Sequence, residues 1–163
     1  ELTAAPAKAA PAGFYRRSRS KSIENWEVAQ NEQLFHLREQ MFAVTRRLTR
    51  HALEEVDPEP LNIAAYGIGD EYRPHCDGRC SGDWHQPGER IATSITYCQV
   101  AAEGGQTTFT ADVLKIHPDA GDMLVFSYLV NHVLVTDEAS HGACPVLAGT
   151  KWIASQWYRA PTR

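Results

Sequence analysis

The sequence predicts a mainly β protein of the α+β kind, in which a supporting helix precedes a double-stranded β-helix, also called a jelly roll. An apolar pattern with helical spacing lies in the first third of the chain, and short β-like runs follow it to the end. Turn sequences such as Gly-Gly and Asp-Ala-Gly separate those runs. Short strands in series with such turns are typical of two packed sheets of a jelly roll.

The length and composition fit one globular domain. A chain of 163 residues can bury a real hydrophobic core, and its 43% hydrophobic residues, 22% charged residues and net charge of -4 are ordinary for such a domain. The basic cluster at residues 16–21 is short, so we interpret it as a solvated edge rather than a nucleic-acid site. The longest apolar run, Met123–Val135, contains polar residues and is too short to span a bilayer, so we expect no membrane segment.

Three regions follow one another along the chain. Residues 1–22 are rich in Ala and Pro and then basic, which favours an arm or linker, residues 23–57 form a supporting helical region, and residues 58–163 form the β core. The chain starts with Glu1 rather than Met. We therefore expect one domain that is a fragment of a longer protein, with any signal peptide outside it.

The helix is expected between about Gln30 and Leu53. Apolar residues recur there at steps of three and four, which places them on one helical face. That face covers barely two heptads, so packing against a sheet is favoured over a coiled coil. The helix must end before Asp57-Pro58-Glu59-Pro60. The apolar face comprises Leu34, Leu37, Met41, Val44 and Leu48.

Eight strands are predicted after this helix, from β-like composition bounded by turn residues. They are residues 62–66, 72–77, 90–98, 107–111, 114–117, 122–129, 133–140 and 151–158.

The segment Tyr72-Arg-Pro-His-Cys-Asp77 has the pattern of half a metal site. Successive side chains of an extended strand point to opposite faces, so His75 and Asp77 project to one side and Cys76 to the other. An imidazole and a carboxylate are two of the three ligands of the facial triad of non-heme Fe(II) oxygenases. His141, after a strand-like run, is the best candidate for the third ligand.

Three further features accompany these residues and carry a resemblance. They are the Gly-Gly-x-Thr at residues 104–107, the Pro-x-x-Gly at residues 118–121 and Lys151, ten residues after His141. In this order and spacing, over roughly residues 58 to 159, the chain resembles the catalytic domain of the 2-oxoglutarate-dependent prolyl 4-hydroxylases, the collagen type included.

The resemblance implies the cofactors and the reaction. His75, Asp77 and His141 would bind Fe(II), and 2-oxoglutarate and O2 would be cosubstrates, with ascorbate as reductant. The reaction would be hydroxylation of proline at C4 in a protein or peptide, with procollagen-like or other proline-rich chains as substrates.

The resemblance also implies roles for residues outside the triad. A cosubstrate carboxylate buried in the barrel needs a cation, and Lys151 would supply it. Tyr66 and Thr107 match positions whose hydroxyls hold the same carboxylate. Alternation along the last strand places Trp157 on the same face as Lys151. The residues expected to line the peptide groove are Tyr72 and Arg90.

Three expectations concern the substrate and its surroundings. The segment 78–89 has the composition of a mobile loop and is expected to fold over the substrate. Arg159 stands where several family members have a His, which predicts a different peptide preference. Collagen-type enzymes assemble with protein disulfide isomerase, so we expect this or another partner subunit and a location in the endoplasmic reticulum lumen or secretory pathway.

The four cysteines, Cys76, Cys80, Cys98 and Cys144, allow three full pairings or none. The resemblance implies that Cys144, shortly after His141, lacks a partner within this chain. A zinc site built from Cys76, Cys80, His85 and His75 is a rival interpretation, although strand alternation separates its neighbouring ligands. The sequence is also compatible with a catalytically silent jelly roll that binds proline-rich peptides and with a hydroxylase of another residue type.

Overall fold

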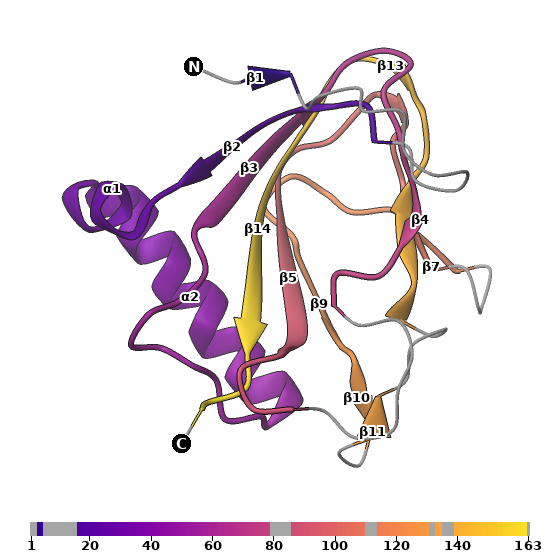
Figure 1. Cartoon of the computed structure of the whole chain (residues 1–163). Coiled ribbons are helices and arrows are strands. Elements are labelled where there is room, and N and C mark those ends of the chain that lie inside the picture. The colour runs from indigo at the N-terminus through magenta and orange to yellow at the C-terminus, as the bar shows by residue number, and fades with distance from the viewer. Residues whose placement is uncertain are drawn as a thin grey trace.

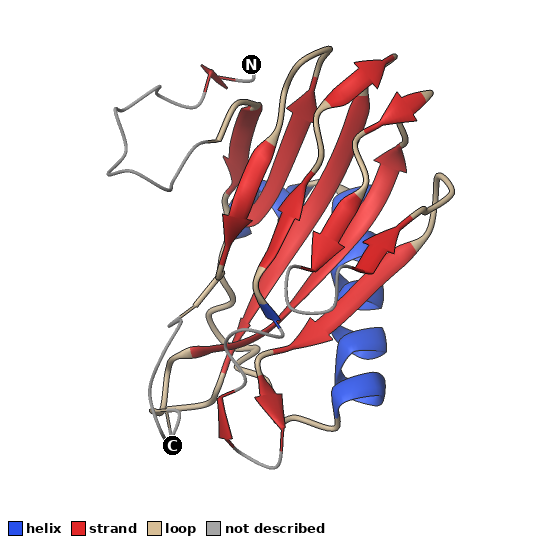
Figure 2. Cartoon of the chain, turned by 90° about the vertical axis from the view of Figure 1, so that its right-hand side faces the viewer, coloured by secondary structure: helices blue, strands red, loops and turns tan. Residues whose placement is uncertain are grey.

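Two facing antiparallel sheets form the body of the protein, and helices cover the outer face of the larger one (Figures 1 and 2). The computed structural model describes residues 3–4, 16–78, 86–109, 114–130, 133–134 and 139–162. The larger sheet has the strand order β1-β2-β3-β14-β5-β9, and the smaller has the order β4-β12-β7-β8. This is the predicted mainly β architecture.

The larger sheet comprises β1 (Thr3–Ala4), β2 (Arg19–Ile23), β3 (Leu61–Tyr66), β14 (Lys151–Arg159), β5 (Arg90–Gln99) and β9 (Met123–Ser127). The smaller comprises β4 (Tyr72–His75), β12 (His141–Ala143), β7 (Thr107–Phe109) and β8 (Leu114–Ile116). Two short pairs at the ends of the sheets are β6 (Glu103–Gly104) with β13 (Val146–Ala148) and β10 (Leu129–Val130) with β11 (Val133–Leu134).

The helical region consists of two helices, α1 (Asn25–Gln30) and α2 (Glu32–Thr49). Helix α1 begins with a capping box in which Glu24 and Glu27 satisfy each other's backbone amides, and Asn31 caps α2 by accepting a hydrogen bond from Leu34 N at 3.1 Å. The break at Asn31 was not predicted. Met41 packs with Val28, Leu61 and Ala154 between helices and sheet, so α2 supports the sheet as expected.

The predicted apolar face of α2 is wrong at its C-terminal half. Val44 and Leu48 are exposed, by 37% and 65%, whereas Phe42 and Thr45 are buried. The buried face is centred between Met41, Phe42 and Thr45, because the helix crosses the sheet at an angle that brings Phe42 onto the ring of Tyr158. Hydrophobic spacing alone does not report this rotation.

Residues 19–23, expected partly in the N-terminal arm, form the strand β2. It pairs with β3 from Arg19 opposite Ala65 to Ile23 opposite Leu61. The basic and hydroxyl side chains of β2 stay partly or fully exposed while its backbone joins the ladder, which explains why its composition predicts a solvated segment. Just before it, Arg16 forms an isolated bridge with Tyr72 and so connects the two sheets.

Strand bounds differ from the prediction mostly around the smaller sheet. Strand β4 ends at His75 rather than at Asp77. Of the expected strand 133–140, residues 133–134 form β11, residues 139–140 are not in a strand, and residues 135–138 lie outside the described residues. Strands β6, β12 and β13 were not predicted, because two- and three-residue strands have too few residues to show alternation.

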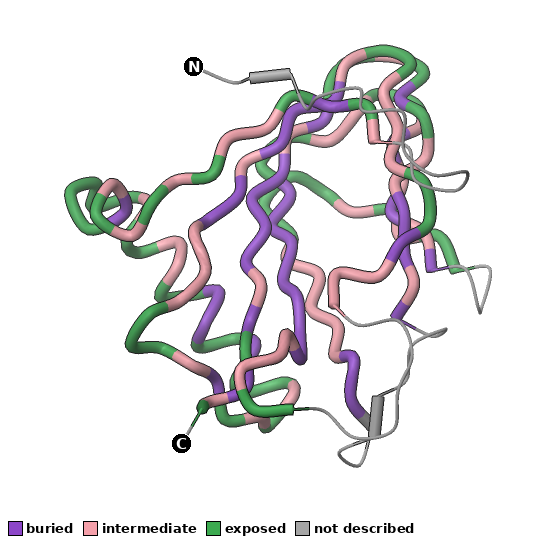
Figure 3. Tube along the Cα trace, in the orientation of Figure 1, coloured by how far each residue is buried: buried purple, intermediate pink, exposed green. Residues whose placement is uncertain are grey.

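The buried residues concentrate in the central strands β3, β14 and β5 (Figure 3). Alternate residues of these strands face either the helices or the space between the sheets. Between the sheets lie Ala64, Tyr66, Ile95, Tyr97, Val146 and Ile153. On the described part of the chain, every helix is too short or too polar to cross a bilayer.

The cysteines are not fully paired. Cys76 is disulfide-bonded, whereas Cys98 and Cys144 are free thiols, as expected for Cys144. Cys80 and His85 lie outside the described residues. A sulfur engaged in a disulfide is not a thiolate ligand, so the rival zinc site loses Cys76.

We predict that Gly142→Ala lowers the free energy of unfolding by about 1–3 kcal/mol. A Cβ at Gly142 would lie 2.8 Å from Tyr72 O and 3.2 Å from Pro74 N, so the paired strands β4 and β12 would have to separate. Urea unfolding measures the change. Gly67→Ala is the matched control, because its Cβ would meet only Asp70 Oδ2 at 3.7 Å. Equal stability of the two variants would contradict the close approach.

Candidate metal centre and pocket

The three predicted metal ligands converge at one point between the sheets. His75 ends β4 and His141 begins β12, and the two residues are direct partners in the antiparallel ladder. Asp77 lies in a bend just after β4. One ligand atom from each residue lies within 4.8 Å of the others, and the side chains are 5%, 8% and 6% exposed for His75, Asp77 and His141. Strand pairing therefore brings His141 next to His75, although the two residues are far apart in the sequence.

Both imidazoles turn Nε2 toward this point and Nδ1 toward a backbone carbonyl. His75 Nδ1 lies 3.0 Å from Arg73 O, and His141 Nδ1 lies 2.9 Å from Ala139 O. In each case the backbone carbonyl accepts a hydrogen bond from Nδ1–H, which leaves the Nε2 lone pair for a metal. His75 Nε2 and His141 Nε2 each lie 3.4 Å from one oxygen of Asp77, namely Oδ1 and Oδ2 respectively.

The protonation states suit a divalent metal. Burial lowers the pKa of His141 below its ordinary value. Burial alone would raise the pKa of Asp77, but the hydrogen bonds to His75 and Thr93, together with the charge that an imidazole carries when protonated, hold this pKa well below its usual range. A carboxylate beside a neutral imidazole is the form that binds metal. Two imidazoles and one carboxylate on one side leave room for other ligands, which fits Fe(II).

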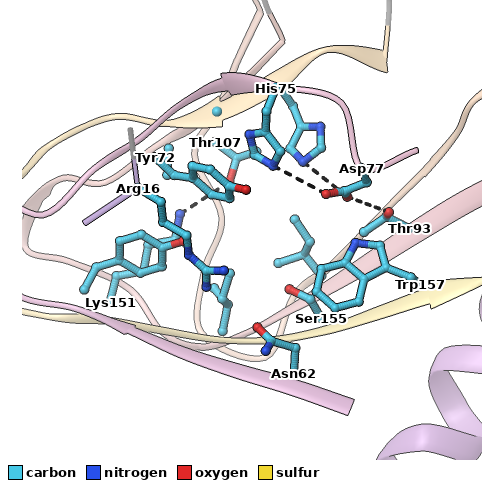
Figure 4. Close-up of a pocket in the computed structure, with 16 residues that line it drawn as sticks. Arg16, Asn62, Tyr72, His75, Asp77, Thr93, Thr107, Lys151, Ser155 and Trp157 are labelled. Atoms are coloured by element: carbon cyan, nitrogen blue, oxygen red, sulfur yellow. Dashed lines mark hydrogen bonds and ion pairs between the residues drawn. The ribbon is translucent and has the colours of Figure 1, made fainter. Parts of the chain in front are cut away.

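A pocket leads from this centre to Lys151 at the start of β14 (Figure 4). Lys151 is 2% exposed, and its Nζ donates to Gly105 O at 2.7 Å and to Thr107 Oγ1 at 3.4 Å. Among the described residues, Lys151 forms no ion pair with a carboxylate. Burial lowers the pKa of Lys151 to about 8. A buried ammonium without a counterion suits an anionic ligand.

Two hydroxyls and two aromatic rings lie around this ammonium. Tyr97 OH donates to Thr107 Oγ1 at 2.8 Å, so Thr107 Oγ1 accepts from Tyr97 and Lys151 and its own proton is free for a ligand. The ring centroids of Tyr66 and Tyr97 lie 5.6 and 5.4 Å from Lys151 Nζ. Tyr66 is the ladder partner of Lys151. The structure therefore places Tyr66, Thr107 and Lys151 together and adds Tyr97.

Trp157 faces the same pocket as Lys151, Ile153 and Ser155, as alternation along β14 predicts. Its Nε1 is buried and has no hydrogen-bond partner among the described residues. The guanidinium of Arg90 lies over its ring, 4.4 Å from the centroid. Trp157 thus lies on the metal side of the pocket, close to Asp77 and Thr93 in Figure 4 rather than beside the ammonium.

Arg90 and Tyr72, predicted to line the peptide groove, also support the metal centre. Arg90 Nη1 donates to Asp77 O at 2.7 Å, and Arg90 Nε donates to Glu59 at 2.7 Å. Arg159 binds the same carboxylate, with its Nε 2.8 Å from Glu59 Oε1. The Tyr72 ring stacks on His75 with centroids 3.6 Å apart. The segment expected to cover substrate lies largely outside the described residues.

The structure adds pocket residues that the sequence did not indicate. Arg16 lines the pocket, and its guanidinium lies 5.0 Å from the centroid of the Tyr72 ring. Its basic neighbours in the sequence had suggested only a solvated edge. Thr93 and Tyr97 lie on the pocket side of β5 with Ile95 between them. Alternation counted from Arg90 selects the opposite face, because the register shifts between Arg90 and Ala92.

Comparisons with known proteins agree with this geometry. The sequence profile described as "2OG-Fe(II) oxygenase superfamily" matches residues 61–159. The chain is 33% identical over 149 residues to "Prolyl 4-hydroxylase subunit alpha-1" of Caenorhabditis elegans, covering 88% of this chain and 25% of that protein. It is 29% identical over 120 residues to "Prolyl 4-hydroxylase 13" of Arabidopsis thaliana, covering 64% and 44%.

The fold is similar to that of a solved viral enzyme. The collagen prolyl hydroxylase of Paramecium bursaria Chlorella virus-1, solved as a 2OG complex, superposes with a TM-score of 0.73 and 27% identity, covering 89% of this chain and 80% of that one. This similarity confirms the predicted jelly roll. The chain spans only a quarter to under half of the length of the two relatives compared by sequence.

We predict that Lys151→Met raises the free energy of unfolding of the ligand-free protein at pH 7 by about 1–3 kcal/mol. Burial lowers the pKa of Lys151 in the folded state to about 8, whereas in the unfolded chain it is about 10.4. Between about pH 8 and 10.4 only the unfolded wild type keeps the proton on Lys151. Raising the pH through this range therefore stabilises the folded wild type, and the difference in free energy of unfolding between the variant and the wild type becomes smaller.

Urea unfolding at pH 7 and pH 9.5 measures the difference in free energy of unfolding between Lys151→Met and the wild type. The control is Lys115→Met, which removes an exposed ammonium from β8, so its difference from the wild type should not change with pH. If the difference in free energy of unfolding between Lys151→Met and the wild type grew with pH, this would contradict a buried charge at Lys151.

Proposed function

The chain belongs to the 2OG-Fe(II) oxygenase superfamily, and from this membership we propose that it hydroxylates proline at C4 in a protein or peptide. One observation carries the proposal. A His75-Asp77-His141 centre faces a pocket that ends at the buried ammonium of Lys151, which pairs with no carboxylate of the described residues. The similarity to prolyl 4-hydroxylases of several organisms supports proline as the target.

In this proposal the three converging side chains hold Fe(II). His75 Nε2, His141 Nε2 and one oxygen of Asp77 are the ligand atoms, since each imidazole uses its Nδ1 for a backbone carbonyl. With Fe(II) and 2-oxoglutarate bound, one oxygen atom of O2 enters the proline C4–H bond and the other enters succinate as the keto acid loses CO2.

The other end of the pocket holds the far carboxylate of 2-oxoglutarate. Lys151 supplies the charge, Thr107 donates its free hydroxyl proton, and the buried Tyr66 is the ladder partner of Lys151 beside them. Trp157 lies toward the metal and packs against bound cosubstrate. Because these groups are buried, they exclude water from the reacting atoms.

The substrate approaches from the side of Tyr72 and Arg90. Tyr72 stacks on His75, and Arg90 is fixed by Glu59 and by the backbone of Asp77. Arg159 shares Glu59 with Arg90 and donates to Gly88 O at 2.7 Å. A procollagen-like or other proline-rich chain is the substrate we propose, with a sequence preference set partly by Arg159.

Further proposals concern the reductant, the partner and the compartment. Ascorbate is the proposed reductant that keeps the iron in the Fe(II) state. The similarity to the alpha-1 subunit of the C. elegans enzyme supports a partner subunit, for which protein disulfide isomerase is our candidate. The disulfide at Cys76 supports the endoplasmic reticulum lumen or secretory pathway, because disulfides persist in oxidising compartments.

We predict that His75→Ala or Asp77→Ala abolishes succinate release in the presence of Fe(II), 2-oxoglutarate and a proline peptide, because each variant removes a metal ligand. A panel of proline peptides, including a collagen repeat, is analysed by mass spectrometry for the gain of one oxygen on proline. His36→Ala is the control, since His36 is 66% exposed and pairs only weakly with Glu32.

Each other outcome of this assay has a meaning. Peptide binding without succinate would favour the silent peptide-binding jelly roll. An added oxygen on another residue would favour a hydroxylase of different specificity. Wild-type turnover by His75→Ala would contradict the proposed metal ligands.

We predict that Lys151→Ala weakens 2-oxoglutarate binding at least 10-fold, because it removes the cation for the far carboxylate. Wild-type affinity also falls above pH 8, since the pKa of Lys151 is about 8 and the neutral amine attracts no anion. Calorimetry with Mn(II) in place of Fe(II) measures both effects. Unchanged affinity in Lys151→Ala would contradict this role, and Lys115→Ala is the matched control.

A further inference from the structure

A pair of buried hydroxyls lies behind the Asp77 carboxylate. Thr93, on the central strand β5, and Tyr128, just after β9, are 1% and 4% exposed. Thr93 Oγ1 donates to Asp77 Oδ2 at 2.8 Å, and Tyr128 OH lies 3.4 Å from the same oxygen. The two hydroxyls are also hydrogen-bonded to each other. Figure 4 shows Thr93 directed at Asp77 from the side away from Lys151.

These hydroxyls distinguish the two oxygens of the carboxylate. Each oxygen faces one imidazole at 3.4 Å, Oδ1 the Nε2 of His75 and Oδ2 the Nε2 of His141. Only Oδ2 also receives Thr93 and Tyr128, whereas Oδ1 has no hydroxyl partner among the described residues. A chain from Tyr128 O–H to Thr93 Oγ1 and from Thr93 O–H to Oδ2 satisfies both buried hydroxyls. Oδ2 is thereby engaged, and Oδ1 is the oxygen left for a metal.

The distinction matters because a carboxylate can bind a metal through one oxygen or through both. A three-residue facial centre must keep three adjacent positions free. A carboxylate that binds through both oxygens would occupy one of them. Hydrogen bonds that engage Oδ2 favour binding through Oδ1 alone.

Asp77 needs such support because no strand holds it. Strand β4 ends at His75, and Asp77 lies in a bend before residues outside the described ranges. Its backbone is held by Arg90, through the 2.7 Å hydrogen bond to Asp77 O. Its side chain is held from β5, where Thr93 pairs with Trp157 on one side and with Phe126 on the other. A central strand is a rigid base for a positioning contact.

We propose that Thr93 and Tyr128 are positioning residues that make Asp77 bind the metal through Oδ1 only. The inference rests on the metal centre of the proposed function, and it is independent of which residue is hydroxylated. It assigns a task to two side chains that neither contact the pocket's ammonium end nor serve as metal ligands.

The test measures metal binding without cosubstrate, peptide or turnover. We expect Thr93→Val, which keeps the shape and removes the donor, to raise the Kd for Mn(II) about 10- to 100-fold. We expect the water-proton relaxation by the bound Mn(II) to fall by about one third, as one of three open positions is lost. Thr93→Ser keeps the hydroxyl and should restore both values toward the wild type.

Thr96→Val is the matched control. Thr96 lies on the same strand, its exposure is 9%, and its Oγ1 has no hydrogen-bond partner among the described residues. Removing this hydroxyl should leave the Kd and the relaxation unchanged. If Thr93→Val does not fold, as its melting curve would show, Tyr128→Phe is measured instead, and the same directions of change are expected.

Wild-type values of both quantities in folded Thr93→Val would overturn the proposal. So would equal losses in Thr93→Val and Thr93→Ser, which would indicate packing rather than the hydroxyl. A protein that shows the expected metal-binding changes but hydroxylates no proline would leave this inference standing and reject the proposed substrate.

Discussion

The antiparallel pairing of β4 with β12 is the constraint on which the site depends. Residues that face each other across such a pair project to the same side, and His75 faces His141. Their ring centroids are 4.4 Å apart, so the ladder itself sets the separation of the two imidazoles. The strands can approach this closely because Gly142 has no Cβ, which would lie 2.8 Å from Tyr72 O. The rest of the site is arranged around this pair.

Two buried charges of opposite sign lie along one pocket. Asp77 is placed among imidazoles and hydroxyls at one end, and Lys151 is placed among hydroxyls and aromatic rings at the other. Burying either charge opposes folding unless a partner compensates it. A metal at one end and a carboxylate at the other would do so, and a single ligand that bridges both would neutralise the whole pocket. The charges of Asp77 and Lys151 thus destabilise the ligand-free protein, and the same charges favour a ligand that neutralises them.

Residue types and strand alternation predicted much of the site, but they did not predict the residues that hold Asp77 in place or Arg16 in the pocket. Alternation placed Trp157 with Lys151, and motif order selected His141 from the other histidines. Thr93 and Tyr128 were missed because a Thr in a strand, or a Tyr just after one, gives no sign in the sequence of whether its hydroxyl meets a carboxylate. Arg16 was missed because a basic cluster gives no sign of which member turns inward. Val44 was misplaced because helical spacing does not report the angle of a helix on a sheet.

The sequence by itself determined which elements form and which residues could carry the chemistry, because strand alternation, turn residues and ligand types are local properties of the chain. Only the tertiary structure decided that β2 joins the sheet, that Arg90 holds the backbone of Asp77, and that two hydroxyls meet one oxygen of its carboxylate. Those contacts join residues far apart in the chain. Their geometry depends on strand register and packing, which local sequence patterns do not specify.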